Sequence, residues 1–417
     1  MFGTYDWRDV FRESRNIPDA YMERGPLSQL GKYFLMSEPP FSFMLSGGDT
    51  WSRQEAVDEL LYRMIGEIPL ILLDGDGQLM RQVYGIWRMK SDEWQRPCCP
   101  LWNLGPENSS GFEPFLGMSA ERIVEAVSNL GKEQGYTVTP ALDRVVRAHI
   151  SALELMGTSV SLSGFHYLCG IEDMDTLGRM IRRLPKGGEL WKSMGVDDED
   201  HSQFDLFRAV LRGFAGDAAA SGWLGAGSVR NCNCLQALRN NAAMVMTVGG
   251  DSARRMLTYL ASELEGFSRT VPALLLMENV NMESETFCDK LAARAGSWSV
   301  GIMGNNVPGL LRDENTFHRV CAGMKQIAAM KQSIYTSAET FSKVMGTFDT
   351  VQASVNKGSH ARAFECYDDS HDKGIHYERK EEYRCRPQEL MDLGAGETVI
   401  LNTEDNALLF YEGFFEG

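Results

Sequence analysis

Residues 41–54 read FSFMLSGGDTWSRQ and combine an apolar run, a pair of glycines and the start of a helical pattern. Phe41–Ser46 is bounded by a proline and a glycine, which predicts a short buried β-strand. From Gln54 to about Gly66, apolar residues recur on one helical face. The stretch therefore predicts a strand, a glycine-containing turn and a helix in direct succession.

Further along the chain, apolar runs of strand length alternate with amphipathic helical patterns. We expect strands at Pro69–Leu73, Ala242–Val248, Pro272–Met277, Trp298–Met303, Gln326–Met330 and Thr398–Leu401. Such alternation predicts a mostly parallel sheet that helices cover on both faces. The fold class expected from the sequence is therefore α/β.

The chain has 417 residues, more than one hydrophobic core usually holds, since cores stop growing at roughly 250–300 residues. Residues 1–40 are expected to form a lead-in that packs on the core. Residues 82–235 show helical periodicity and no convincing strand, which predicts an all-α inserted domain. The α/β domain would then consist of residues 41–81 and 236–417. Within it, the polar stretch 353–386 predicts a long loop or hairpin.

The turn after the first strand stands where a phosphate-binding loop, G-x-x-x-x-G-K-[ST], would stand. In such a P-loop, backbone N–H groups and the helix N-terminus hold phosphate. Only Gly47 matches the pattern, because Ser52 replaces the second glycine and Arg53 the lysine. If a nucleotide binds, the candidate contacts are Gly47, Gly48, Thr50, Ser52, Arg53, Gln54, Asp74 and Asn305.

A second candidate lies at the end of the strand ALLLMEN, residues 273–279. Many P-loop motors end this strand in Asp-Glu, where the Asp orients the metal and the Glu acts on the attacking water. Here Met277 takes the first position and Glu278 the second. On these residues alone, a buried strand with a polar residue at its end is the favoured interpretation. Glu278 is the catalytic candidate if the protein is active.

The order of the segments resembles the TraG/TraD-type coupling ATPases of conjugation and type IV secretion. The matching pieces are LLDGDGQL (72–79), a helical insertion, MVMTVGGDSARRMLTYL (244–260), PALLLMENV (272–280), GIMGNN (301–306), SIYTSAETFSKVMG (333–346) and RPQELMDLGAGETVILN (386–402). Together they cover about residues 40–405. The resemblance implies a P-loop NTPase fold, a hexameric ring, ATP hydrolysis and transport of DNA or protein through a membrane pore. It leads us to expect the strand 41–46 beside the strand 272–277, with the turn 47–53 close to Glu278.

The departures from that family concern the parts that handle the γ-phosphate. The lysine, the magnesium-binding hydroxyl (Gln54 stands in its place), the metal-site Asp and the sensor glutamine are missing, and Gly304 or Asn305 takes the last position. Each loss costs such enzymes orders of magnitude in rate. We therefore expect a degenerate, non-hydrolysing relative that acts as an interaction or adaptor subunit of a mobile-element DNA-transfer system.

Two alternatives remain open at the level of sequence. A divergent but active DNA- or protein-translocating motor would use ATP and magnesium, with Arg53 in the role of the lysine. An unrelated doubly wound α/β binding protein would owe nothing to the motors. No cofactor is expected for the preferred hypothesis.

Charge and composition limit the partners. The formal net charge of −16 disfavours broad binding to nucleic acid. No apolar run reaches the roughly 18–20 residues of a membrane span. The nine cysteines and the absence of an N-terminal export pattern predict free thiols and a cytoplasmic protein. The expected partners are proteins of a transfer or secretion apparatus, with a homo-oligomer as a further expectation.

No metal site is predicted. The candidates within the polar stretch are His360, Cys366, His371, His376 and Cys385. Their spacing fits no standard zinc site, so a solvated loop is the favoured interpretation.

Overall fold

The computed structural model describes residues 20–35, 40–105, 110–196, 201–220, 222–223, 231–264, 273–294, 298–357 and 373–415. A ten-stranded sheet in the order β1-β14-β13-β10-β2-β9-β8-β3-β7-β4 forms its centre. These strands are β1 (Ala20–Pro26), β2 (Ser42–Ser46), β3 (Leu70–Asp74), β4 (Leu101–Leu104), β7 (Ala243–Thr247), β8 (Leu274–Glu278), β9 (Ser299–Gly304), β10 (Gln326–Ala329), β13 (Glu397–Asn402) and β14 (Ala407–Phe414). Neighbours are parallel except at β10–β13 and β13–β14, so the mostly parallel sheet is confirmed.

Helices cover both faces of the sheet, which is why its central strands are apolar along their whole length. On one face, Phe43 and Leu45 of β2 belong to a core shared with η1 (Leu27–Leu30), α2 (Gly31–Phe34), α3 (Thr50–Met64) and α4 (Leu79–Glu93). Met44, between them, belongs to the core of the opposite face. That face is covered by α12 (Ala253–Leu264), α13 (Glu285–Arg294), α15 (Glu314–Cys321) and α16 (Tyr335–Met345).

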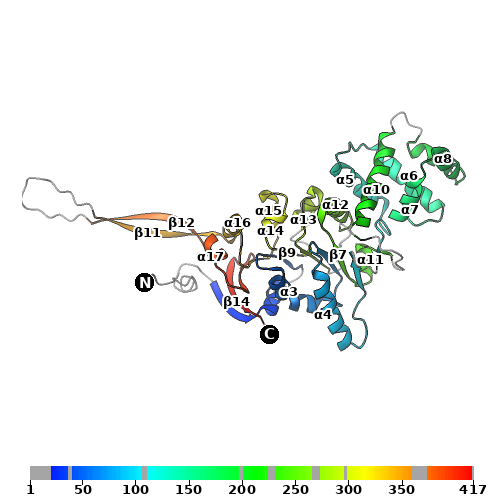
Figure 1. Ribbon diagram of the computed structural model, residues 1–417. Helices are drawn as coiled ribbons and strands as arrows, with labels where there is room; N and C mark the ends of the chain where they lie inside the picture. The colour runs from blue at the N-terminus through cyan, green and yellow to red at the C-terminus, as the bar shows by residue number, and fades with distance from the viewer. Residues whose placement is uncertain are drawn as a thin grey trace, which may run out of the picture.

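A helical bundle lies at one end of the molecule (Figure 1). It contains α5 (Ala120–Glu133), α6 (Ala141–Leu155), α7 (Leu162–Gly170), α8 (Met174–Arg182), α9 (Gly187–Ser193) and α10 (Ser202–Ala220). The expectation that no strand lies between residues 82 and 235 is wrong, because β4, β5 (Gly111–Phe112) and β6 (Asn231–Cys232) lie there. β4 extends the main sheet by pairing with β7, a partner that is distant in sequence. Strands of two to four residues carry too little periodicity to be predicted. The domain boundaries themselves stay a prediction.

A long hairpin projects from the end of the molecule opposite the bundle (Figure 1). It pairs β11 (Thr347–Lys357) with β12 (Lys373–Tyr383) in antiparallel register. The remaining elements are α11 (Cys234–Arg239), η2 (Gly250–Ser252), α14 (Val307–Leu310) and α17 (Pro387–Met391). Among the described helices, none has the length and apolar character of a membrane span.

Candidate functional site

The connection between β2 and α3 is three residues long. β2 ends at Ser46 and α3 begins at Thr50, so the expected start of the helix at Gln54 is wrong by about one turn. Asp49 is the reason, because its Oδ1 accepts the backbone N–H of Ser52 at 2.7 Å and caps the helix. Thr50, Ser52, Arg53 and Gln54 therefore lie on the first turns of a helix, and only Gly47 and Gly48 of the candidate contacts lie in the loop.

The two glycines are held by neighbouring loops. Gly47 and Gly48 have φ angles of +90° and +64°, a region that favours glycine. The N–H of Gly47 donates to the carbonyl of Gly304 and that of Gly48 to the carbonyl of Lys331, both at 2.9 Å. Both amides, which a phosphate-binding loop would direct at its ligand, are thus engaged within the protein.

Gln332, which the sequence did not single out, packs behind the loop. Its Nε2 donates to the carbonyls of Ser46 and Met330 at 2.9 Å each, and a Cβ added to Gly47 would lie 2.3 Å from that nitrogen. Its Oε1 accepts the hydroxyl of Ser337 at 2.7 Å. A polar residue three positions past β10 was the only available signal in the sequence, and it is a weak one.

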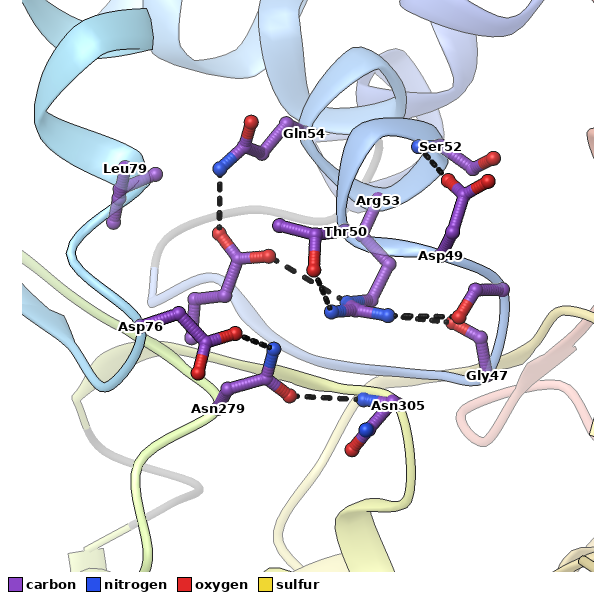
Figure 2. Close-up of polar contacts among 12 residues, drawn as sticks. Gly47, Asp49, Thr50, Ser52, Arg53, Gln54, Asp76, Leu79, Asn279 and Asn305 are labelled. Atoms are coloured by element: carbon purple, nitrogen blue, oxygen red, sulfur yellow. Dashed lines mark hydrogen bonds and ion pairs between the residues drawn. The ribbon is translucent and has the colours of Figure 1, made fainter. Parts of the chain in front are cut away.

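Arg53 folds back from α3 into the turn (Figure 2). Its Nη1 donates to the carbonyls of Gly47 and Gly48 at 3.2 and 2.9 Å, and its Nη2 donates to Thr50 Oγ1 at 3.1 Å. The Arg53 side chain is completely buried, and its Nε lies 3.5 Å from Oε1 of Glu278. The guanidinium therefore bonds to the loop's own carbonyls.

Glu278 ends β8 and completes this pair. Its Oε2 accepts a hydrogen bond from Nε2 of Gln54 at 3.4 Å, and its side chain is 1% exposed. Burial raises the pKa of Glu278 to about 7, although the charge of Arg53 acts in the opposite direction. Burial likewise lowers the pKa of Arg53. Through its contacts with Arg53 and Gln54, Glu278 joins the end of β8 to the start of α3.

The other candidate residues have local structural roles. The carboxylate of Asp74 accepts the N–H groups of Gly77 and Leu79 at 2.8 and 2.7 Å, and so shapes the turn into α4. The backbone N–H of Asn305 donates to Asn279 Oδ1 at 3.0 Å. Asn279, which the sequence analysis missed, also donates from Nδ2 to Asp76 at 2.6 Å (Figure 2). The turns after β3, β8 and β9 are thereby joined.

The expected neighbourhood of the strands was half right. The strand at 41–46 does not lie next to the strand at 272–277, because β9 lies between β2 and β8. A crossover helix lets a later strand enter between two earlier ones, so sequence order does not fix spatial order. The turn is nevertheless close to Glu278, as the contact with Arg53 confirms.

No cluster of metal-binding side chains is found among the described residues. His360, Cys366 and His371 of the predicted polar stretch lie outside those residues, and His376 lies in β12. Cys385 is buried, and every cysteine in the described ranges is free.

The fold has counterparts among solved structures. The bacterial conjugative coupling protein TrwBdeltaN70, in its unbound monoclinic form, is similar with a TM-score of 0.58 and 13% identity, over 94% of this chain and 92% of that chain. TrwB in complex with the non-hydrolysable ATP analogue ADPNP is similar with a TM-score of 0.51 and 12% identity, over 84% and 86%. No protein-family model and no curated protein sequence matches. The chain therefore has the P-loop NTPase-like fold seen in a conjugative coupling protein.

Proposed function

We propose that this protein is a non-hydrolysing relative of the conjugation and type IV secretion coupling ATPases. It keeps the fold of a motor as a platform for other proteins and acts as an adaptor subunit of a DNA-transfer system. The observation that carries the proposal is the closed turn between β2 and α3, where the protein's own groups occupy the donors and the space that a phosphate would need.

We expect that a nucleoside triphosphate does not fit this turn. The amides of Gly47 and Gly48 already donate to protein carbonyls, and the guanidinium of Arg53 lies against the loop. The carboxylate of Asp49 caps the helix N-terminus, the place where an anion would otherwise be stabilised. Hydrogen bonds from Ser52 lower the pKa of Asp49, so a negative charge stands there at neutral pH.

The same fold serves TrwB, which has been solved with ADPNP and with ADP and Mg²⁺. We therefore propose that this protein differs from TrwB in the turn between β2 and α3. We further propose that its protein partners belong to a transfer or secretion apparatus. The unpaired cysteines of the described ranges support a reducing compartment and thus a cytoplasmic location. The net charge of −16 argues for protein partners rather than DNA.

Turnover of Mg–ATP by the purified full chain, with and without DNA, tests the loss of hydrolysis. We expect no phosphate release above that of Glu278→Gln, a variant that keeps the size and polarity of the side chain. The alternative function, a divergent motor, has one observation in its favour, because a carboxyl with a pKa of about 7 is suited to proton transfer near neutral pH. Turnover that Glu278→Gln abolishes would establish the motor and refute the proposal.

Affinity capture with the tagged chain from its native host tests the adaptor role separately. We expect proteins of a transfer or secretion apparatus to be retained, and double-stranded DNA to bind weakly at physiological salt because of the net charge. Recovery of proteins from unrelated processes alone would contradict the adaptor role while leaving the result on hydrolysis intact.

A further inference from the structure

A small cavity lies at the edge of the sheet opposite the turn between β2 and α3. The turn follows the last residue of β2, whereas Gln326, which lines the cavity, is the first residue of β10, a strand parallel to β2. The cavity has a volume of about 190 Å³, and its walls come from β1, α2, β10, β13 and β14. An apolar cavity of about 150 Å³ holds a benzene molecule, so this space suits a ligand of similar size.

Gln326 brings a buried carboxamide to this cavity. The residue is 5% exposed, and it lies on the same face of β10 as Ala328 and Met330, which belong to the core shared with α2 and α3. Among the described residues, no group donates a hydrogen bond to this carboxamide or accepts one from it. Buried polar side chains are normally hydrogen-bonded, and one without a partner destabilises the fold. The hydrogen-bonding groups of Gln326 are therefore directed into the cavity.

The mouth of the cavity is acidic. Among the described residues of its lining, Glu23 of β1 and Asp405, in the turn between β13 and β14, are the exposed ones. A second carboxamide, that of Asn402, belongs to the lining and is opposite Gln326 in the register of β13 with β10. Its Oδ1 accepts the backbone N–H of Glu404 at 3.1 Å. Carboxylates only accept hydrogen bonds, and carboxamide oxygens accept them too, so the polar groups of the lining favour a cationic donor.

Lys32 shows how one wall of the cavity holds a positive charge. Its Nζ lies 4.8 Å from the centroid of the Tyr33 ring and 3.8 Å from Oε2 of Glu23. The same carboxylate oxygen accepts the hydroxyl of Tyr33. A carboxylate beside an aromatic ring attracts a cation both through its charge and through the electrons of the ring. Glu23 and Asp405 together outnumber the one ammonium of Lys32, so the mouth keeps a net negative charge.

We propose that this cavity binds a small organic cation, an ammonium or amidinium group carried on an apolar body about the size of a benzene ring. The charged group donates to the carboxamide oxygen of Gln326, and the carboxylates of Glu23 and Asp405 attract it. The apolar body packs against Tyr33 and Ile400 of the lining. The carboxylates disfavour an anion, and a purely apolar molecule would leave Gln326 without a partner. The inference does not depend on the proposed function, which concerns the opposite edge of the sheet.

Calorimetric titration of benzamidinium chloride into the purified full chain tests this site. The probe carries an amidinium group on a benzene ring, and benzamide and benzoate are its neutral and anionic counterparts of similar shape. We expect saturable binding of benzamidinium that weakens as salt is added, because the carboxylates at the mouth are exposed. Benzamide and benzoate should bind at least about tenfold more weakly, since neither forms a charge-assisted hydrogen bond to the lining. No saturable binding of benzamidinium, or equally tight binding of benzamide, would overturn the inference.

Gln326→Met keeps the size of the side chain and removes its carboxamide. The affinity for benzamidinium should fall about tenfold, while the midpoint of thermal unfolding without ligand should not fall. Asp405→Asn, at the exposed mouth, should weaken binding about twofold to fivefold. The matched control is Gln388→Met, at an exposed position of α17, which should leave the affinity unchanged. A Gln326→Met variant that binds benzamidinium like the wild type, or that unfolds at a lower temperature without it, would show that the carboxamide serves the fold and would contradict the inference.

Discussion

At the scale of single residues, the buried pair of Arg53 and Glu278 defines the site. Burying two charges costs more than a 3.5 Å ion pair returns unless further hydrogen bonds assist it. The carbonyls of Gly47 and Gly48 supply that assistance to the guanidinium. Sequence reasoning placed Arg53 as a poor substitute for a phosphate-binding lysine, because charged residues are rarely buried completely. Its inward orientation depends on partners that fold in from other strands.

Replacing Arg53 should therefore destabilise the protein strongly. We expect Arg53→Ala to lower the free energy of unfolding by about 3–5 kcal/mol, since it leaves Glu278 and two carbonyls without their partner in a buried place. The control is Arg63→Ala on the same helix, where a half-exposed arginine pairs with Glu59 and the loss should be about 0.3–0.5 kcal/mol. Urea unfolding measures both, and equal losses would refute the structural role of Arg53.

A second matched comparison uses Gly47, in the turn before α3, and Gly85, inside α4. Gly47→Ala should cost about 1–3 kcal/mol or more, because φ is +90° and the new Cβ would meet Gln332. Gly85→Ala, inside α4 with no atom within 4 Å of the new Cβ, should instead stabilise by up to about 1 kcal/mol. Thermal unfolding checks the pair, and a stabilising Gly47→Ala would show that the turn is open in solution.

At the scale of elements, the strands and helices that could be predicted were those with a clear local pattern of apolar residues. β2, β3, β8 and β9 could be predicted because strands buried on both faces are continuous apolar runs. The start of α3 was missed because the sequence analysis did not use Asp49 as a helix cap. The insertion of β9 between β2 and β8 was missed because pairing of parallel strands depends on contacts between distant segments.

The helix α12 carries a buried carboxyl that makes stability depend on pH. Glu263 accepts the backbone N–H of Cys234 at 2.9 Å, and burial raises its pKa to about 7 from an ordinary value of 4.5. The folded state therefore binds the proton more tightly than the unfolded state. Stability should fall as pH rises from about 4.5 to about 7, by about 3 kcal/mol for this group, and then level off.

Glu263→Gln removes this titration while it keeps an acceptor for Cys234. The variant should lose less stability than the wild type when denaturant unfolding is repeated between pH about 5 and about 8. Because the pKa of Glu278 is also raised, the stability of the variant should still fall with pH, but less than that of the wild type. If the free energy of unfolding depended on pH in the variant as it does in the wild type, or if the stability of the wild type increased with pH over this range, a protonated Glu263 in the folded protein would be contradicted.

At the scale of the whole molecule, the sheet lies between the helical bundle and the hairpin of β11 and β12 (Figure 1). The alternation of strands and helices was enough to predict the sheet class. The polar stretch 353–386 was expected only as a loop or hairpin, because the register of β11 with β12 depends on pairing between two strands and not on the pattern within either one. The turn between β2 and α3, whose groups bond to one another and to neighbouring loops, is the feature on which the proposed adaptor role depends.

Calorimetric titration of Mg–ATP into the purified full chain measures the central property of this account. The closed turn predicts no saturable heat, because the amides of Gly47 and Gly48 already donate to Gly304 and Lys331, and Arg53 already donates to the carbonyls of the two glycines. Arg53→Ala serves as a comparison in which the turn loses its internal guanidinium. Saturable, magnesium-dependent binding to the wild type would contradict the account.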